Sequence, residues 1–177
     1  MSEAKHGRLP PEVARYFEQM SPEERIQAVL SVRAPNDQRF TSAWMEQQCK
    51  LRDVKVLSPT HSFVTFAFKV ERYYCNGSGN LHGGAQATIF DIATSIAMQA
   101  IGKEDFWING GVSRALTVTY LRPAPEGEQL LLECDVVHMG KRLAMLKGTL
   151  KRESDGAVIS TCDHNKAAVP TKPGWKL

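Results

Sequence analysis

Asp91 is the residue whose surroundings most strongly suggest chemistry. It is the only charged side chain between Gly83 and Gly102, in a stretch rich in small and apolar residues. Burying an unpaired carboxylate is costly, so a carboxylate retained in an apolar helix is a candidate for catalysis. There it could activate or orient a water molecule. The competing interpretation is a buried ion pair, for instance with Arg114.

Two glycines at the start of the same helix could supply hydrogen-bond donors. His82-Gly83-Gly84 precedes the apolar stretch, and the first N–H groups of a helix have no partner within it. Glycine lets a ligand approach these donors closely, which suits a carbonyl oxygen that becomes an oxyanion. The plainer interpretation is an ordinary loop-to-helix junction. Asn76, in the preceding loop, could donate to the same oxygen or hold an Asx-turn.

Ser113 lies in the first strand predicted after this helix. Alternation along a strand puts it on one face with Ala115, Thr117 and Thr119. Its hydroxyl could then hydrogen-bond a water molecule or a carboxylate. No G-x-S-x-G motif surrounds it, so it is not predicted to be a nucleophile.

The remaining reactive side chains form weaker sets. Cys75 and His82 could pair as nucleophile and base, but no third group occupies a recognisable position to orient the base. The other histidines are scattered, and no metal site is predicted. Gly140-Lys141-Arg142 is a basic turn, which becomes interesting only for a ligand that carries phosphates.

The elements that must position these residues follow from periodicity. Residues 63–70 are rich in aromatic and β-branched side chains and predict a strand. A loop from Asn76 to Asn80 leads to one long helix, from about Gly84 to Ile101. Four further strands are predicted at about 112–122, 129–138, 142–152 and 157–169.

The turns between the last four strands are short, which favours an antiparallel meander. A helix that is apolar nearly all round must be enclosed by other elements. Together these features predict an α+β fold, in which one antiparallel sheet wraps around one long central helix. This arrangement is called the hotdog fold.

Composition excludes several classes. The chain has 177 residues, 42% of them hydrophobic, and a formal net charge of +3. It is too apolar to be disordered and too weakly basic for a nucleic-acid binder. No apolar run is long enough for a membrane span. The four cysteines form no C-x-x-C pair, so we expect reduced thiols and an intracellular protein, cytoplasmic or mitochondrial.

The first fifty residues differ from the rest of the chain. They carry as many acidic as basic side chains, so the whole excess of +3 lies after residue 50. Ser21, Pro22 and Glu24 predict a helix start with a capping box, and another short helix is predicted through Trp44. The predicted organisation is a helical extension over residues 1–50, a hotdog domain over 51–169, and a loose tail over 170–177.

At residues 76–113 the sequence resembles a known family. The pattern Asn76-x6-Gly83-Gly84-Ala85-x5-Asp91, followed by Gly111-Val112-Ser113, resembles the hotdog acyl-CoA thioesterases of the phenylacetate-degradation type and their thioesterase-superfamily relatives. Residues 76–85 match that family's N-x-x-G-x-L-H-G-G-x segment. Residues 116–124 resemble its next strand, and residues 140–144 resemble its G-K-x-x-A turn. The resemblance covers about residues 51–169.

The resemblance implies hydrolysis of an acyl-CoA thioester to a free acid and CoA, in lipid metabolism, with no metal and no cofactor beyond the CoA of the substrate. By position, Gly83 N–H and Asn76 would polarise the carbonyl. Asp91 would activate or orient water, which Ser113 would help to hold. The residues implied to line the CoA path are His82, Tyr120, Arg122, Pro123, Gly140, Lys141 and Arg142, the last two near phosphates.

Helix geometry indicates that two chains share each site. Gly83 and Asp91 are eight residues apart, or about 12 Å along a helix. An oxyanion donor and a base must both lie within about 3 Å of the reacting atoms or one water away. Antiparallel helices of a symmetric dimer could bring Gly83 of one chain to Asp91 of the other. We therefore expect a homodimer, or a dimer of dimers.

Two other functions remain open from the sequence. A hotdog dehydratase or hydratase would use a histidine as base at the acyl chain, with His82 as the nearby candidate. A non-catalytic acyl-CoA sensor or scaffold would bind the ligand without needing Asp91. The isolated carboxylate favours hydrolysis over both.

Overall fold

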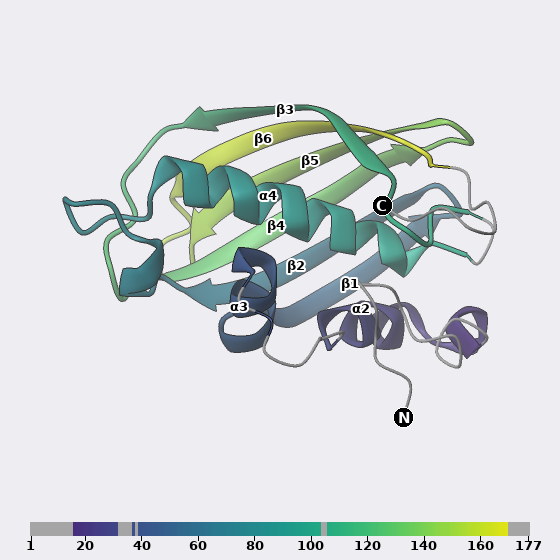
Figure 1. The fold of residues 1–177 in the computed structure, drawn as a ribbon, viewed down its shortest axis with the longest axis horizontal. Coiled ribbons are helices and arrows are strands. Elements are labelled where there is room, and N and C mark those ends of the chain that lie inside the picture. The colour runs from purple at the N-terminus through teal and green to yellow at the C-terminus, as the bar shows by residue number, and fades with distance from the viewer. Residues whose placement is uncertain (1–15, 32–36, 38, 104–105, 170–177) are drawn as a thin grey trace.

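One long helix and a six-stranded sheet form the centre of the described structure. The computed structural model describes residues 16–31, 37, 39–103 and 106–169. The predicted tail at 170–177 and the first part of the extension, residues 1–15, lie outside the described residues. The helix lies across one face of the sheet (Figure 1). This is the predicted α+β hotdog architecture.

The strands form where the sequence alternates. Every neighbouring pair is antiparallel, in the order β1-β2-β4-β5-β6-β3. Their bounds are Lys50–Ser58 for β1, His61–Lys69 for β2, Val112–Tyr120 for β3, Gln129–Met139 for β4, Leu143–Arg152 for β5 and Val158–Ala167 for β6. The five strands predicted from residue 63 onward are all present.

The predicted meander of the last four strands is wrong at its first strand. β3 pairs with β6 at the edge of the sheet, while β4 pairs with β2 and β5. The link from β3 to β4 is not a hairpin, because these two strands are not neighbours in the sheet. The link is held instead against the loop before the helix. Ala124 O accepts from Leu81 N at 2.8 Å, and Glu126 N donates to Gly79 O at 2.9 Å.

The central helix α4 spans Gly83–Ala97 and continues as a short 3₁₀ turn, η3, at Met98–Ala100. Phe90 is fully buried against β5, where a Cβ at Gly148 would lie 2.6 Å from its ring. Glycine at this strand position therefore lets the helix pack closely. A buried hydrogen bond of 2.7 Å from Ser160 Oγ to Gln86 Oε1 ties α4 to β6.

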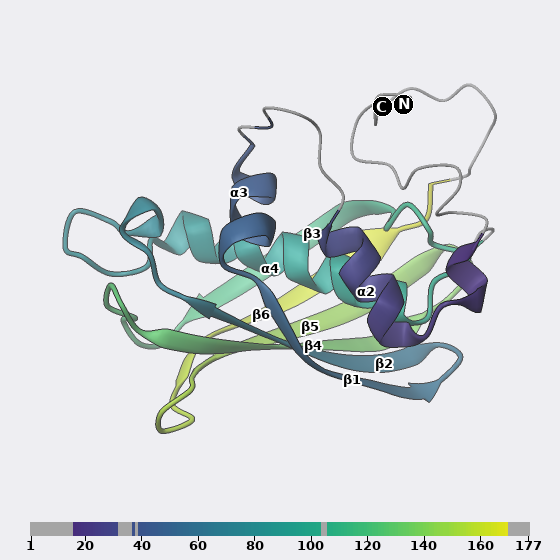
Figure 2. The same cartoon turned by 90° about the horizontal axis from the view of Figure 1, so that it is seen from below.

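The described N-terminal helices pack on the same side of the sheet as α4 (Figure 2). A short 3₁₀ turn, η1, comes first, followed by α2 and α3; their bounds are Phe17–Gln19, Pro22–Leu30 and Phe40–Gln47. The capping box at Ser21 is confirmed, with both reciprocal hydrogen bonds to Glu24 present. Trp44 is fully buried, its ring centroid 5.6 Å from that of Phe68 in β2. The extension thus contributes to the same core as α4.

One side of α4 is left uncovered in a single chain. Gly84 is exposed, and Thr88, Asp91 and Ser95 are half-buried along this side. The adjacent strand β3 is largely exposed and is an edge of the sheet. The helix is therefore largely enclosed, as predicted, with one side open in a single chain.

Candidate functional site

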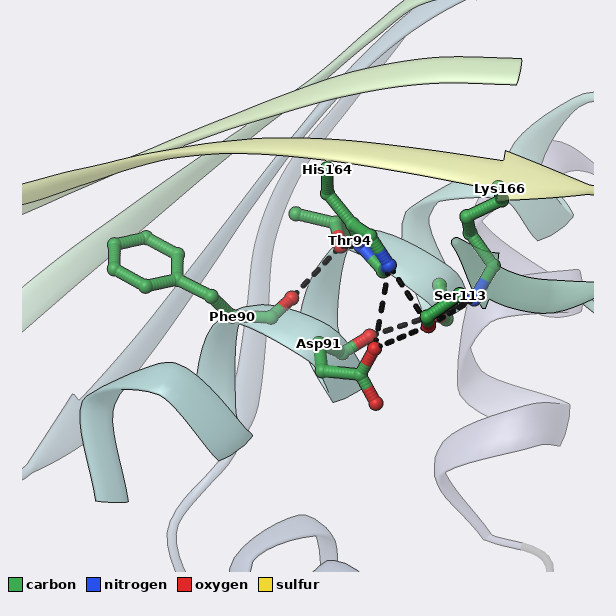
Figure 3. A network of polar contacts seen from close by, with 7 residues as sticks. Phe90, Asp91, Thr94, Ser113, His164 and Lys166 are labelled. Atoms are coloured by element: carbon green, nitrogen blue, oxygen red, sulfur yellow. Dashed lines mark hydrogen bonds and ion pairs between the residues drawn. The ribbon is translucent and has the colours of Figure 1, made fainter. Parts of the chain in front are cut away.

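A polar cluster forms where the uncovered side of α4 meets β3 and β6. Ser113 Oγ donates to Asp91 Oδ1 at 2.6 Å and lies 2.9 Å from His164 Nε2. His164 Nε2 is 3.2 Å from the same carboxylate oxygen. Figure 3 shows these three side chains pointing toward one another from three different elements. The Asp91 side chain is 45% exposed, so one carboxylate is both held in place and open to solvent.

A β-bulge directs Ser113 toward the helix. β3 and β6 pair Ser113 with Lys166 but Ala115 with Asn165, so Arg114 is an extra residue in β3. The predicted face of Ser113, Ala115, Thr117 and Thr119 is therefore wrong. The bulge breaks the alternation, and Ser113 shares the α4-facing side of the sheet with Lys166, its partner in β6, and with Leu116, the partner of His164. Bulges commonly re-aim a side chain in this way.

Asp91 has a different partner from the one considered in the ion-pair interpretation. Arg114 is exposed on the bulge, whereas the buried groups facing Asp91 are His164 and Lys166. His164 is fully buried and Lys166 is 4% exposed. Lys166 Nζ lies 2.7 Å from Ser95 Oγ and 3.3 Å from Ser113 Oγ. The carboxylate thus has buried basic neighbours on one side and solvent on the other.

Burial controls the protonation of both basic groups. Desolvation lowers the pKa of His164 to about 4, assisted by the charge of Lys166 and opposed by that of Asp91. Desolvation also lowers the pKa of Lys166, again opposed by Asp91. His164 is therefore a neutral imidazole near pH 7.

The start of α4 presents a free backbone donor at Gly83. The imidazole of His82 caps the helix, because its Nδ1 accepts from Gly84 N at 2.9 Å. Within the described residues, Gly83 N has no hydrogen-bond partner. The Gly83 carbonyl accepts instead from Tyr120 Oη at 2.8 Å, which ties the end of β3 to this turn. The cap thus occupies the second N–H and leaves that of Gly83 available.

Asn76 forms the Asx-turn that the sequence allowed. Its Oδ1 accepts from Ser78 N at 3.0 Å and from Asn80 N at 3.2 Å. Its Nδ2 has no partner among the residues that the structure describes. The turn therefore fixes the side chain and leaves its amide as a donor.

A cavity of about 570 Å³ opens beside the helix start. Phe40 of α3 and Tyr73 and Tyr74, in the 3₁₀ turn η2 (Arg72–Tyr74), line one wall. Phe40 and Tyr73 each pack edge-on against Tyr74, with ring centroids 5.1 Å apart. The lining also includes Cys75, His82, Gly84, Ala85 and Thr88. Aromatic side chains thus form part of the lining, next to the first residues of α4.

The residues implied to line a CoA path lie at two ends of β3. Tyr120, Arg122 and Pro123 are at its end, near the start of α4, where Arg122 Nη1 donates to Val158 O at 2.8 Å. Lys141 and Arg142 are exposed in the β4–β5 turn beside the start of β3, because Leu143 and Val112 both pair with Ala167. The length of β3 separates the two sets by about 26 Å.

Gly83 and Asp91 lie two helical turns apart on α4, as helix geometry predicted, so the donor and the carboxylate do not meet within one chain. The Cys75–His82 pair that was weighed as nucleophile and base does not form either. Cys75 donates from Sγ to Glu71 O at 3.5 Å, and burial raises the pKa of this thiol. That keeps it protonated and removes support for a Cys75–His82 pair.

The sequence interpretation missed His164 and Lys166 as members of the cluster. It treated His164 as one of several scattered histidines. The alternation along β6 could have identified them, because His164 and Lys166 are two residues apart and lie on the same face as the buried Cys162. Polar side chains at alternate positions of an inward face point to a polar site under the helix.

The described residues contain no group of three or more metal-ligating side chains. In this part of the chain, the helices are also too short or too polar to cross a membrane.

Comparisons with known proteins agree with this architecture. The sequence profile described as "Thioesterase superfamily" matches residues 78–159. Acyl-coenzyme A thioesterase 13 of Homo sapiens is 30% identical over 116 residues, which cover 66% of this chain and 80% of that protein. The crystal structure of thioesterase superfamily member 2 from Mus musculus superposes with a TM-score of 0.67 and 25% identity, covering 85% of this chain and 99% of that one. The E. coli PaaI protein from the phenylacetic acid degradation operon has the same fold, with a TM-score of 0.65, 18% identity and coverage of 84% and 93%.

Proposed function

Because the chain belongs to the thioesterase superfamily, we propose that it hydrolyses acyl-CoA to a free acid and CoA. Family membership makes it a thioester hydrolase; the substrate and the residue roles are the proposal. The observation that carries the roles is the half-exposed Asp91 carboxylate, held through Oδ1 by Ser113 and His164. Among the described residues its Oδ2 has no partner and is available to a water molecule.

In the proposed reaction, Asp91 takes a proton from water as the water oxygen bonds to the thioester carbon. Ser113 fixes the carboxylate and helps to hold the water. The carbon–sulfur bond then breaks, and the CoA sulfur leaves as a thiol with that proton. A covalent route, in which Asp91 itself attacks and forms an anhydride, requires the same carboxylate.

The carbonyl oxygen is proposed to bind at the start of α4. Gly83 N–H and Asn76 Nδ2 are free donors in neighbouring segments, and donors fixed before the reaction stabilise a developing oxyanion. The aromatic cavity beside them would take the acyl group, with Phe40 supplied by the N-terminal extension. Tyr74 and Phe40 would favour an apolar acyl chain over a charged one.

Each site is proposed to combine two chains of a homodimer, which could pair further into a tetramer. Three features support this: the separation of Gly83 from Asp91 on α4, the separation of the two CoA-lining sets along β3, and the uncovered side of α4 beside an unpaired sheet edge. Exposed edges of this kind normally pair or are covered. An antiparallel two-fold dimer would bring both separated sets together.

Lys141 and Arg142 are expected to bind the phosphates of CoA. Reversing both charges with Lys141→Glu and Arg142→Glu should raise KM for acyl-CoA at least about tenfold, because a charge-assisted hydrogen bond contributes about 1.5 kcal/mol. An acyl thioester of N-acetylcysteamine, which lacks the nucleotide, should keep its KM. The matched control reverses Lys55 and Lys69 on the far strands, with the same change in net charge. Equal effects on both substrates would assign the turn a structural role only.

The function itself is tested by incubating the protein with a panel of acyl-CoA thioesters and detecting the released thiol. Hydrolysis of at least one apolar acyl-CoA supports the proposal. Binding without turnover would instead indicate a sensor or scaffold. Hydration of an enoyl-CoA without thiol release would indicate the hydratase, although His82 Nδ1 is already occupied as a helix cap. We propose a cytoplasmic or mitochondrial location, which the free thiols of the four cysteines support.

A further inference from the structure

The proposed hydrolysis leaves two buried basic groups behind Asp91 without a role. His164 and Lys166 are fully or almost fully buried, yet both point at Ser113, and His164 also faces the Asp91 carboxylate (Figure 3). Buried ionisable groups are costly and are retained mainly where their protonation matters.

The protonated nitrogen of His164 follows from its neighbour Thr94. Thr94 Oγ1 lies 2.7 Å from Phe90 O and 2.7 Å from His164 Nδ1. The carbonyl can only accept, so the single hydroxyl proton of Thr94 goes to Phe90 O. Nδ1 must therefore carry a proton and donate it to Thr94. In the neutral imidazole, Nε2 is then an unprotonated acceptor that faces Asp91 and Ser113.

The direction of the Lys166 hydrogen bond follows in the same way. Ser95 Oγ donates its only proton to Asp91 O at 2.6 Å. Ser95 Oγ must then accept from Lys166 Nζ, which lies 2.7 Å away. Lys166 also reaches Ser113 Oγ at 3.3 Å. Its ammonium is thus oriented toward the cluster by two hydroxyl oxygens.

Asp91 Oδ1, Ser113 Oγ and His164 Nε2 form a triangle that holds a single proton. Its sides are 2.6, 2.9 and 3.2 Å, and only the Ser113 hydroxyl brings a proton of its own. With an ionised carboxylate and a neutral imidazole, the 3.2 Å side joins two acceptors. One added proton, on either Asp91 or His164, turns that side into a hydrogen bond.

We propose that His164 and Lys166 are positioning residues that prepare this triangle to receive the proton taken from water. His164 accepts a hydrogen bond from the protonated Asp91 once the carboxyl group has turned so that the oxygen carrying the new proton faces Nε2. Before the substrate arrives, the Lys166 ammonium disfavours any second proton in the triangle. The inference rests on the proposed hydrolysis for its role, but the protonation states can be measured without any substrate.

The groups facing His164 determine in which direction its pKa changes when Lys166 is replaced. Asp91 faces it from α4, and Lys166 and the thiol of Cys162 lie on its own strand; the flanking strands contribute the hydroxyl of Ser113 on β3 and apolar Leu146 on β5. Burial raises the pKa of Cys162 to about 12, so this thiol stays neutral. Removing the Lys166 charge must therefore raise the pKa of His164 and favour premature protonation.

The test is Lys166→Met. In this variant, imidazole ¹⁵N shifts recorded on the substrate-free protein should show His164 taking up a proton at higher pH than in the unaltered protein. The acidic limb of kcat/KM should move to higher pH, with kcat/KM at pH 5 at least about tenfold lower and recovery toward pH 8. KM at pH 8 should not change.

Two further variants keep the result interpretable. Lys166→Arg retains the charge and should keep the titration of His164 close to the original even if it slows turnover. Lys147→Met removes an exposed lysine from the neighbouring strand β5 and should leave both readouts unchanged. If a folded Lys166→Met protein titrates His164 like the original, the inference is wrong, whatever its activity. If His164 responds but no variant hydrolyses acyl-CoA, the protonation device stands and the proposed function fails.

Discussion

Asp91→Asn should lower kcat at least about a hundredfold, the usual scale for loss of a general base. Asparagine keeps the shape of the side chain and can still accept from Ser113 through its oxygen. It cannot take a proton from water, nor form the anhydride of the covalent route. The loss should appear in kcat measured by thiol release, while KM for acyl-CoA changes little.

The matched control is Asp163→Asn, which neutralises an exposed carboxylate on β6 that pairs only loosely with Lys147, at 3.8 Å. It should retain full activity. Far-ultraviolet circular dichroism and thermal unfolding would establish that both variants are folded. Turnover close to that of the original in a folded Asp91→Asn protein would refute the assigned role.

Mixed dimers of Asn76→Ala and Asp91→Asn chains should regain about half of the original activity, although each homodimer is weak. In the shared-site arrangement, the intact Asn76 of one chain faces the intact Asp91 of the other. One of the two sites is then complete and the other is doubly altered. The expected rise in activity over the two parent homodimers is large, because the complete site of the mixed dimer has both the carboxylate and the amide donor. Separately tagged chains, unfolded and refolded together, allow the mixed dimer to be isolated and assayed.

A second pair of variants serves as the control for complementation. Asp91 and Ser113 lie 2.6 Å apart within one chain, so both belong to the same half of a shared site. Mixing Asp91→Asn with Ser113→Ala leaves each site with one altered residue, and no recovery is expected. If isolated mixed dimers of the first pair stay at the level of their parents, the shared-site proposal is wrong.

The elements themselves were predictable because their signals are local. The alternation in residues 63–70 and the uncharged run around Asp91 depend only on how side chains repeat along a strand or a helix. The capping box at Ser21 is satisfied by residues three positions apart. The turns that contain Gly83 and Asn76 are also local, so the free donors there follow from the nearby backbone.

Strand order was not predictable from the same signals. Short turns favoured a meander, but β3 pairs with β6 at the far edge. The reason is that Ala124 and Glu126 in the next link bond to the loop before α4, which carries the chain across the end of the helix. Hydrogen bonds between segments far apart in sequence leave no periodic trace in either segment.

The candidate site was likewise predictable only in its local features. The sequence by itself determined that a lone carboxylate sits on an apolar helix that begins with free backbone donors, because composition and helix geometry suffice for that. Only the tertiary structure decided what surrounds it. One extra residue at Arg114 turns Ser113 toward the helix, and β6 brings His164 and Lys166 to within 3.3 Å of the Ser113 hydroxyl. A bulge and a strand pairing act over tens of residues, so only the folded chain brings these protons and charges together.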